Sequence, residues 1–298
     1  MTTVAIIVNK NWEAEPMLAG MCSNEFRPSS LLFPEVLIPL QDKKYTSDQP
    51  RAIFRCRDGV NIVLEVKVWC VQDLMDKTKN SSSSEEKYRI LPPVLAVEKP
   101  DLVIAAGTAG YLSETSYAGS VVVGGRFFVH NGHPGNPDSD MKHPDLEKLL
   151  PLNINPIVLG IFNPAFKQKT EFKFLKAPVN PAVRSAVLAS QFYTAIGSVN
   201  VTNYGEYNWV DHEAIQSFRT VETKLPVGSL ETTHGVIRLS SNQPCFFVSA
   251  ITDREGHFDM EVTPGQNYIA SFNAGLVLAQ FISDLNEKLK DPKFKISL

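Results

Sequence analysis

The feature that most constrains the fold is a series of short, continuous apolar runs separated by longer segments with helical patterning. The clearest runs are Val4–Val8, Leu102–Ala106, Val121–Val123, Ile157–Phe162 and Phe246–Ile251. Continuous rather than alternating apolarity is typical of strands that helices cover on both faces. The pattern therefore predicts a single-domain α/β protein, an α/β/α sandwich around a twisted, mostly parallel, mixed central sheet.

Helix start signals accompany the strand pattern. Asn180-Pro181 and Thr263-Pro264-Gly265-Gln266 each combine a capping residue with proline at the first helical position. Apolar residues at helical spacing follow the second signal up to Leu289, which predicts a long C-terminal helix packed on the sheet. Two polar segments, near residues 76–90 and 130–150, are predicted as inserted loops. No repeat divides the chain, so residues 1–298 are expected to form one domain.

Charge and composition argue against several classes of protein. Lys and Arg number 29 against 32 Asp and Glu, and a formal net charge of −3 offers no basic surface for a nucleic acid or an anionic membrane. No apolar run approaches the ~20 residues of a membrane span. Residues 1–15 lack the pattern of a signal peptide, and the four cysteines form no metal or redox motif. The sequence thus predicts a cytoplasmic protein with neither nucleic-acid nor membrane partners.

Polar residues follow the predicted strands where parallel strands end, which is where open α/β sheets bind ligands. Glu13 and Glu15 follow the first run, and the glycine turn Gly107-Thr108-Ala109-Gly110 follows the second. The later runs end near a further set of polar and aromatic residues, namely Thr202, Tyr204, Glu206, Tyr207, Glu231, Thr252 and Asp253. These side chains are expected to meet at one rim of the sheet.

A second kind of site was weighed against this one. His130 and His133 are three residues apart in the predicted loop, with Asp138, Asp140 and His143 close behind. Two such histidines can share a metal ion, but histidines in polar loops are more often simply solvated. No metal site is therefore predicted.

Several of these segments, taken in order, resemble signatures of the nucleoside phosphorylase and nucleosidase superfamily. The stretch from Lys99 to Gly110, followed by Gly119–Val123, resembles its KPD-strand-GSAG and GDVVV segments. Leu230-Glu231-Thr232-Thr233 resembles its MEA segment, and Val248–Asp253 resembles its VRAISD strand end. The likeness is greatest to methylthioadenosine/S-adenosylhomocysteine nucleosidases. It covers the first strand and the chain from about Leu95 onward, whereas residues 22–94 match poorly.

The resemblance implies cleavage of an N-ribosidic bond through an oxocarbenium-like sugar, as in glycoside hydrolysis. It implies that Asp253 is the general acid for a purine-type base and that Glu231 accepts hydrogen bonds from the ribose. Glu15, or its neighbour Glu13, would orient the attacking water. The structural alternatives are a turn cap for Asp253 and a residue at a helix N-terminus for Glu231.

The remaining substrate-binding residues follow from the same resemblance. Gly107 and Thr108 would lie near the ribose or the nucleophile, with Thr202 and Thr232 also in the substrate site, and Tyr207 would stack on the base. His234 beside Glu231 is expected either to contact the ligand or to cap a helix. Relatives form dimers to hexamers, so a homo-oligomer is expected.

The resemblance also bears on the nucleophile. Phosphorylases of the superfamily carry an arginine shortly before the glycine turn, where this chain has Ala105 and Ala106. Hydrolysis without a cofactor is therefore favoured. Phosphorolysis, with phosphate as co-substrate, stays open because other arginines could serve, namely Arg27, Arg51, Arg55, Arg57 and Arg126. Ser249 replaces an arginine of the nucleosidases, so a non-catalytic nucleoside-binding relative is the third alternative.

Overall fold

The computed structural model describes residues 1–23, 34–37, 49–75, 84–111, 121–130, 143–162, 199–203, 227–254 and 264–298. At a few of these positions, Asp253 among them, the description covers the backbone alone. The helix predicted after Asn180, the cap at Thr263 and the phosphate-ligand candidate Arg27 lie outside the described residues.

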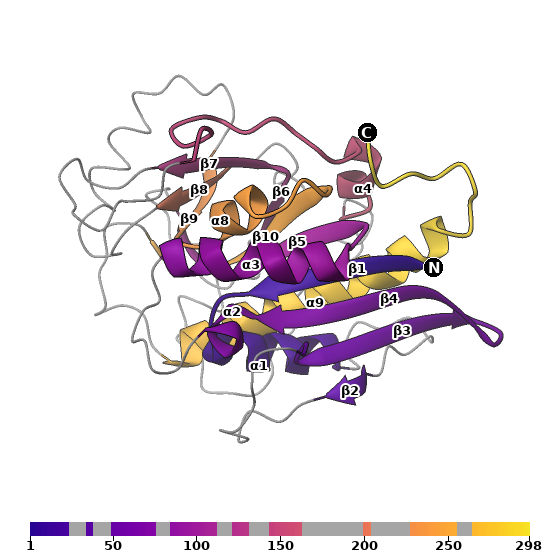
Figure 1. The fold of residues 1–298 in the computed structure, drawn as a ribbon. Coiled ribbons are helices and arrows are strands. Elements are labelled where there is room, and N and C mark those ends of the chain that lie inside the picture. The colour runs from indigo at the N-terminus through magenta and orange to yellow at the C-terminus, as the bar shows by residue number, and fades with distance from the viewer. Residues whose placement is uncertain are drawn as a thin grey trace.

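The described strands form one ten-stranded mixed sheet (Figure 1). The strands are β1 (Thr2–Val8), β2 (Pro34–Leu37), β3 (Ala52–Asp58), β4 (Asn61–Cys70), β5 (Leu102–Tyr111), β6 (Val121–Gly124), β7 (Arg126–His130), β8 (Val199–Asn203), β9 (Val227–Glu231) and β10 (Cys245–Arg254). Their order is β2-β3-β4-β1-β5-β9-β8-β7, and β10 pairs with both β5 and β6. Within this sheet β4, β1, β5 and β10 run parallel to one another.

Helices cover both faces of the sheet (Figure 1). They are α1 (Asn11–Met21), α2 (Val71–Leu74), α3 (Ser84–Glu98), α4 (Pro156–Gly160), α8 (His234–Leu239) and α9 (Pro264–Lys288). Alternate residues of β1 belong to two different apolar clusters: Val4 and Ile6 pack with α1 and α9, whereas Ala5 and Ile7 pack with α3 and α8. The predicted α/β/α arrangement with a mixed sheet is confirmed.

Helix α9 provides much of one layer. Residues 267–288 are long and apolar enough to span a membrane by length and composition, with a mean hydropathy of 1.2, but 78% of the segment is buried within the protein. It packs against α1 at a close crossing where Gly20 faces Gly275. A Cβ at either glycine would overlap a backbone carbonyl oxygen of the other helix. Glycine is therefore required at both positions for the two helices to approach this closely.

The structure corrects two predictions of secondary structure. The run Ile157–Phe162 is not a strand, because residues 156–160 form helix α4. The Asn155 side chain accepts the Ile157 N–H at 3.0 Å and Pro156 follows the cap, a helix start signal that outweighs the apolar run. Residues 84–90 of the predicted loop at 76–90 belong instead to α3, which begins at Ser84 with two acidic residues in its first turn.

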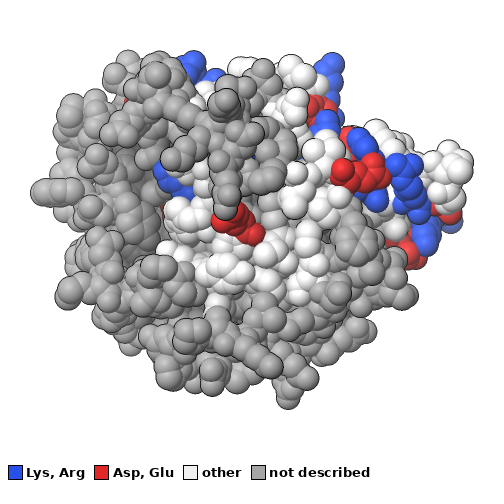
Figure 2. All heavy atoms as spheres, turned by 90° about the horizontal axis from the view of Figure 1, so that it is seen from below, with Lys and Arg blue, Asp and Glu red and all other residues white. Residues whose placement is uncertain are grey.

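The segment that matched poorly contributes a β-hairpin. Strands β3 and β4 pair antiparallel through a two-residue turn, Gly59-Val60, where Gly59 has φ +60°. Charges of opposite sign pair between β3 and its neighbours β2 and β4: Arg55 lies 2.6 Å from Glu35 and 2.7 Å from Glu65, and Arg57 lies 2.9 Å from Glu35. Figure 2, which views the molecule from below relative to Figure 1, shows basic and acidic side chains gathered together at the right-hand end of that face.

Candidate active site

The pairing of β5 changes partway along one of its edges. Ala106 is the last residue of β5 that pairs with β1, and Gly110 pairs with Leu230 of β9. Strand β10 runs along the other edge of β5 from Val103 to Tyr111. Residues 107–109 therefore lie between the end of β1 and the start of the pairing with β9, and this edge of the sheet is open to side chains from the helices.

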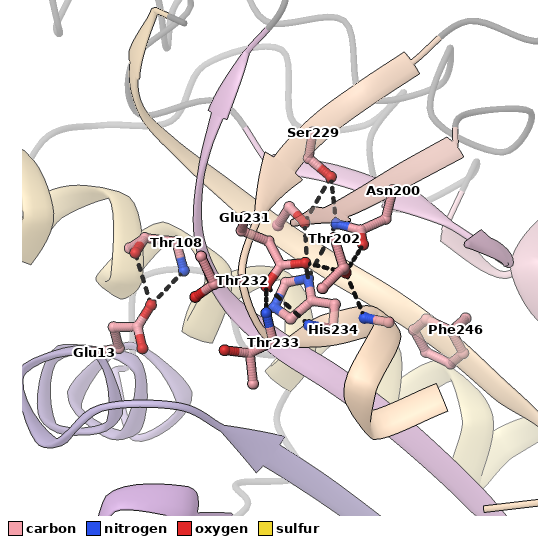
Figure 3. Close-up of polar contacts among 12 residues, drawn as sticks. Glu13, Thr108, Asn200, Thr202, Ser229, Glu231, Thr232, Thr233, His234 and Phe246 are labelled. Carbon is pink, nitrogen blue, oxygen red and sulfur yellow. Dashed lines mark hydrogen bonds and ion pairs between the residues drawn. The ribbon is translucent and has the colours of Figure 1, made fainter. Parts of the chain in front are cut away.

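Glu13 of α1 fills part of this opening. Its side chain is buried, and Oε1 accepts hydrogen bonds from the Thr108 backbone N–H at 2.7 Å and from the Thr108 hydroxyl at 2.6 Å (Figure 3). Its other oxygen accepts the Lys10 N–H at 2.8 Å, in a capping box at the start of α1. One carboxylate thus joins the first helix to the glycine turn after β5.

Gly107 leaves room beside this carboxylate. A Cβ built on Gly107 would lie 3.0 Å from Glu13 Oε1 and 3.3 Å from His234 Nε2, both closer than an ordinary van der Waals contact. His234 is the first residue of α8 and is 2% exposed. Two ionisable side chains from different helices therefore face the same point above Gly107.

Glu231 at the end of β9 holds the start of α8. Its Oε2 accepts backbone N–H groups from Thr233 and, at 2.8 Å, from His234, while Oε1 accepts the Thr202 hydroxyl at 2.6 Å (Figure 3). The side chain is 7% exposed. A carboxylate that accepts the first N–H groups of a helix stabilises the helix start, so the structural alternative expected for Glu231 is present in this structure.

A chain of buried hydrogen bonds links Glu231 to His234. Thr202 Oγ1 also lies 2.8 Å from Asn200 Oδ1, and Asn200 Nδ2 donates to Ser229 Oγ at 3.0 Å. Ser249 Oγ lies 3.0 Å from Ser229 Oγ and 3.2 Å from His234 Nδ1. Because buried polar groups are costly unless they are hydrogen-bonded, this network fixes the orientation of its members. Ser249, at the position of the missing arginine, therefore holds the histidine ring.

Lys87 of α3 adds a buried positive charge. Its Nζ donates to Thr233 Oγ1 at 2.8 Å and to the Thr232 carbonyl at 3.3 Å. Burial lowers the pKa of Lys87 from 10.5 to about 8, and the negative charges of Glu231 and Glu13 oppose this effect. The lysine supports the two-residue turn whose N–H group binds Glu231, and its charge offsets those of two buried acids.

The structure brings together some of the predicted residues. Glu13, Gly107 and Thr108 are in mutual contact, and Thr202 binds Glu231. In Figure 3 the Glu13–Thr108 pair lies to one side and the Glu231 network to the other. Half-buried Thr232 follows Glu231 in the chain, and its carbonyl accepts a hydrogen bond from Lys87.

The other predicted site residues are Glu15, Tyr207 and Asp253. Glu15 lies on the exposed side of α1, away from Thr108. Tyr207 lies outside the described residues. The backbone of Asp253 pairs with Gly110, which also pairs with Leu230. Two strand spacings, roughly 10 Å, therefore separate the backbones of Asp253 and Leu230, next to Glu231. Both acids thus belong to the same end of the sheet by backbone register.

Three of the arginines considered as phosphate ligands have acidic partners. Arg51 is buried and forms a two-point ion pair with Asp73, and its NH2 group donates to Asn11 at 2.9 Å. Arg55 and Arg57 pair with acids of the hairpin region, as described above, and Arg126 lies half-buried on β7. Ala105 and Ala106 are fully buried in β5.

Among the candidate metal ligands, His143 is the one whose side chain the structure describes. Its Nδ1 accepts the Asp145 N–H at 3.1 Å, and its ring packs edge-on against Tyr88 at a centroid distance of 5.6 Å. No group of three or more His, Cys, Asp or Glu side chains suited to a metal ion occurs in the described part of the chain.

Sequence reasoning assigned no role to Lys87, Asn200 or Ser229. A signal for Lys87 exists, because it precedes Leu91 and Leu95 at four-residue spacing and so occupies the buried stripe of α3. A lysine on such a stripe indicates a buried partner. Asn200 and Ser229 lie in apolar strand segments, where a polar residue likewise indicates an internal hydrogen bond.

Comparisons with known proteins add a fold relationship. No protein-family model and no curated protein matches the sequence. The 5'-methylthioadenosine nucleosidase of Arabidopsis thaliana superposes with a TM-score of 0.57 at 16% identity, over 98% of this chain and 99% of that one. The S-adenosylhomocysteine nucleosidase of Streptococcus pyogenes, solved with 5-methylthiotubericidin, gives 0.56 at 14% identity, over 95% and 97%.

A third structure is similar to the same extent. The methylthioadenosine/S-adenosylhomocysteine nucleosidase of Colwellia psychrerythraea, solved with adenine, gives a TM-score of 0.56 at 10% identity, over 95% of this chain and 96% of that one. Nearly the full length of each chain is covered in all three comparisons. The protein therefore has a fold similar to that of the methylthioadenosine/S-adenosylhomocysteine nucleosidases, as the sequence motifs predicted.

Proposed function

We propose that this protein is an N-ribosyl hydrolase that cleaves the bond between the sugar and the base of a purine-type nucleoside or nucleotide. The observation that carries the proposal is the contact of the Glu13 carboxylate with Thr108 beside Gly107, at the carboxyl end of β5. A buried carboxylate at the ligand-binding end of an α/β sheet is suited to orient a water molecule and accept its proton.

The other roles follow from the sequence resemblance. Asp253 protonates the departing base, and Tyr207 stacks on it. Glu231 accepts hydrogen bonds from ribose hydroxyls with the lone pairs that its helix-capping contacts leave open. Thr202 and Thr232 complete this side of the substrate site. The reaction requires no cofactor, because acid, base and nucleophile come from side chains and water.

Water is favoured over phosphate as the nucleophile on two grounds. The positions before the glycine turn are alanines, which cannot bind an oxyanion. Arg51, Arg55 and Arg57 are already paired with acids. Phosphorolysis would require an arginine from another part of the chain or from a neighbouring subunit. We also propose a cytoplasmic homo-oligomer, on the basis of the sequence and the family resemblance.

The test is release of free base from a panel of adenosine, inosine, methylthioadenosine and AMP, with and without phosphate. Two variants of α1 provide a matched pair: Glu13→Gln alters the buried carboxylate at Thr108, and Glu15→Gln alters the exposed one two residues later. We expect base release without phosphate, a loss of roughly 10²-fold or more in kcat for Glu13→Gln, and wild-type rates for Glu15→Gln. Equal effects of the two substitutions, or binding of nucleosides without base release, would refute the proposal.

A further inference from the structure

The space above Gly107 is bounded by two polar atoms that no hydrogen bond joins. Glu13 Oε1 and His234 Nε2 lie 3.0 and 3.3 Å from the position that a Gly107 Cβ would occupy. Within the described contacts, no ion pair links the two side chains directly. Two polar atoms that approach one point from different helices are suited to bind a shared water molecule by hydrogen bonds.

The imidazole ring is held so that Nε2 faces this space. On its other side, Nδ1 lies 3.2 Å from Ser249 Oγ and 3.5 Å from Asn200 Nδ2. The ring stacks on Phe247 at a centroid distance of 6.4 Å and an angle of 22°. A histidine that is buried, stacked and bonded at one nitrogen has a fixed orientation for the other.

The partners of Nδ1 also indicate where the ring proton lies. Asn200 presents its amide nitrogen to this side of the ring, since its amide oxygen faces Thr202. The Ser249 hydroxyl lies on the same side of the ring and donates to Ser229 Oγ, and Glu231 Oε1 lies 4.0 Å from Nδ1. The ring presents an N–H to the space above Gly107 in two states: with its proton on Nε2, which the Asn200 amide nitrogen favours, and with both nitrogens protonated, which the Glu231 carboxylate favours.

We propose that His234 is a catalytic residue that binds the attacking water together with Glu13, an assignment that rests on the proposed hydrolase function. His234 Nε2–H donates to the water oxygen, and Glu13 accepts one water proton. The water oxygen then bonds to the sugar C1′ while the bond from C1′ to the base nitrogen breaks. The base leaves with the electron pair of that bond and takes a proton from Asp253, the acid of the proposed function, and the second water proton remains on the new sugar hydroxyl. The proton on Glu13 passes to solvent and Asp253 regains one from solvent, which restores both acids.

The experiment compares His234→Leu, which removes the donor, with His234→Gln, whose side-chain amide can place an N–H near the position of Nε2. His143→Gln is the matched histidine control, because His143 contacts Asp145 and Tyr88 rather than the Glu231 network. Each variant is checked for folding by its thermal melting curve. Base release is measured in water and in water containing methanol, and the ratio of methyl riboside to free ribose reports the choice of nucleophile.

We expect His234→Leu to lower kcat by roughly 10²-fold with KM changed only a few-fold, and to raise the ratio of methyl riboside to ribose. His234→Gln should recover part of kcat, and His143→Gln should match the wild type. If His234→Leu folds and either keeps the wild-type kcat or keeps the wild-type product ratio, His234 does not bind the nucleophile. Absence of base release by the wild type would instead overturn the hydrolase function itself.

Discussion

Adding one methyl group at Gly107 perturbs the proposed reaction centre without removing any of its polar groups. In Gly107→Ala the new Cβ meets Glu13 Oε1 at 3.0 Å and His234 Nε2 at 3.3 Å. Ordinary carbon contacts begin near 3.5 Å, so one or both side chains must move by a few tenths of an ångström. The methyl group also occupies the space assigned to the attacking water.

The expected magnitudes differ between stability and activity. Overpacking a buried site costs typically about 1–3 kcal/mol, and replacing glycine by alanine returns about 0.4–1 kcal/mol through the unfolded chain. The free energy of unfolding should therefore fall by only about 1–2 kcal/mol. Displacement of catalytic groups by up to 1 Å costs up to about 10²-fold in rate, which corresponds to about 2.7 kcal/mol of barrier. The catalytic loss should thus exceed the loss of stability.

The assay measures kcat for base release together with the free energy of unfolding in urea. Gly160→Ala is the control, because no atom lies within 4 Å of a Cβ at that position and its φ is not positive. The control should keep wild-type kcat and gain slightly in stability. If Gly107→Ala is as stable as the control and keeps the wild-type kcat, the reaction does not use the space above Gly107.

Three further predictions follow from the packing and the charges. The pKa of Lys87 is lower in the folded protein than in the unfolded chain, so its contribution to stability is full above pH 10.5 and is lost as pH falls through about 8. The unfolding free energy of the wild type minus that of Lys87→Met should therefore rise between pH 8 and 10.5. A difference that does not change with pH would contradict the burial of the Lys87 charge. Gly275→Ala forces α1 and α9 apart and should cost at least about 3 kcal/mol in urea unfolding, whereas a loss below 1 kcal/mol would show that the helices adjust freely. Glu231→Gln weakens the cap of α8 and should lower stability by about 1–2 kcal/mol while raising the KM for the nucleoside, and an unchanged KM would remove Glu231 from ribose binding.

Much of the fold could be predicted because continuous apolar runs mark strands buried on both faces. Val4–Val8 and Phe246–Ile251 became β1 and β10 for this reason. The same reasoning failed at Ile157–Phe162, where apolarity alone cannot distinguish a short helix from a strand and the cap at Asn155 decides. The β3–β4 hairpin was missed although glycine at the first position of a two-residue turn, here Gly59-Val60, is typical of hairpins, because its strands do not form a continuous apolar run.

The candidate site was predictable only to the level of strand ends. The sequence placed Glu13, Thr108 and Glu231 at one rim, since polar residues after parallel strands share an edge of the sheet. It preferred Glu15 over its neighbour Glu13, whereas Glu13 is the buried residue that contacts Thr108. Which face of α1 is buried depends on how α1 packs against α9, and the local sequence does not show this packing. Nor could it assign the contact between Ser249 and His234, which lie on different elements and meet through the register of β9 and β10 on either side of β5.

The most direct test of the account follows the oxygen atom that enters the sugar. The protein is supplied in ¹⁸O-labelled water with the purine nucleoside that it cleaves fastest, and the sugar product is analysed by mass spectrometry with and without phosphate. Hydrolysis at the Glu13 site predicts free ribose that carries one ¹⁸O, in an amount independent of phosphate. Ribose 1-phosphate that forms only with added phosphate, or no sugar product despite nucleoside binding, would contradict it.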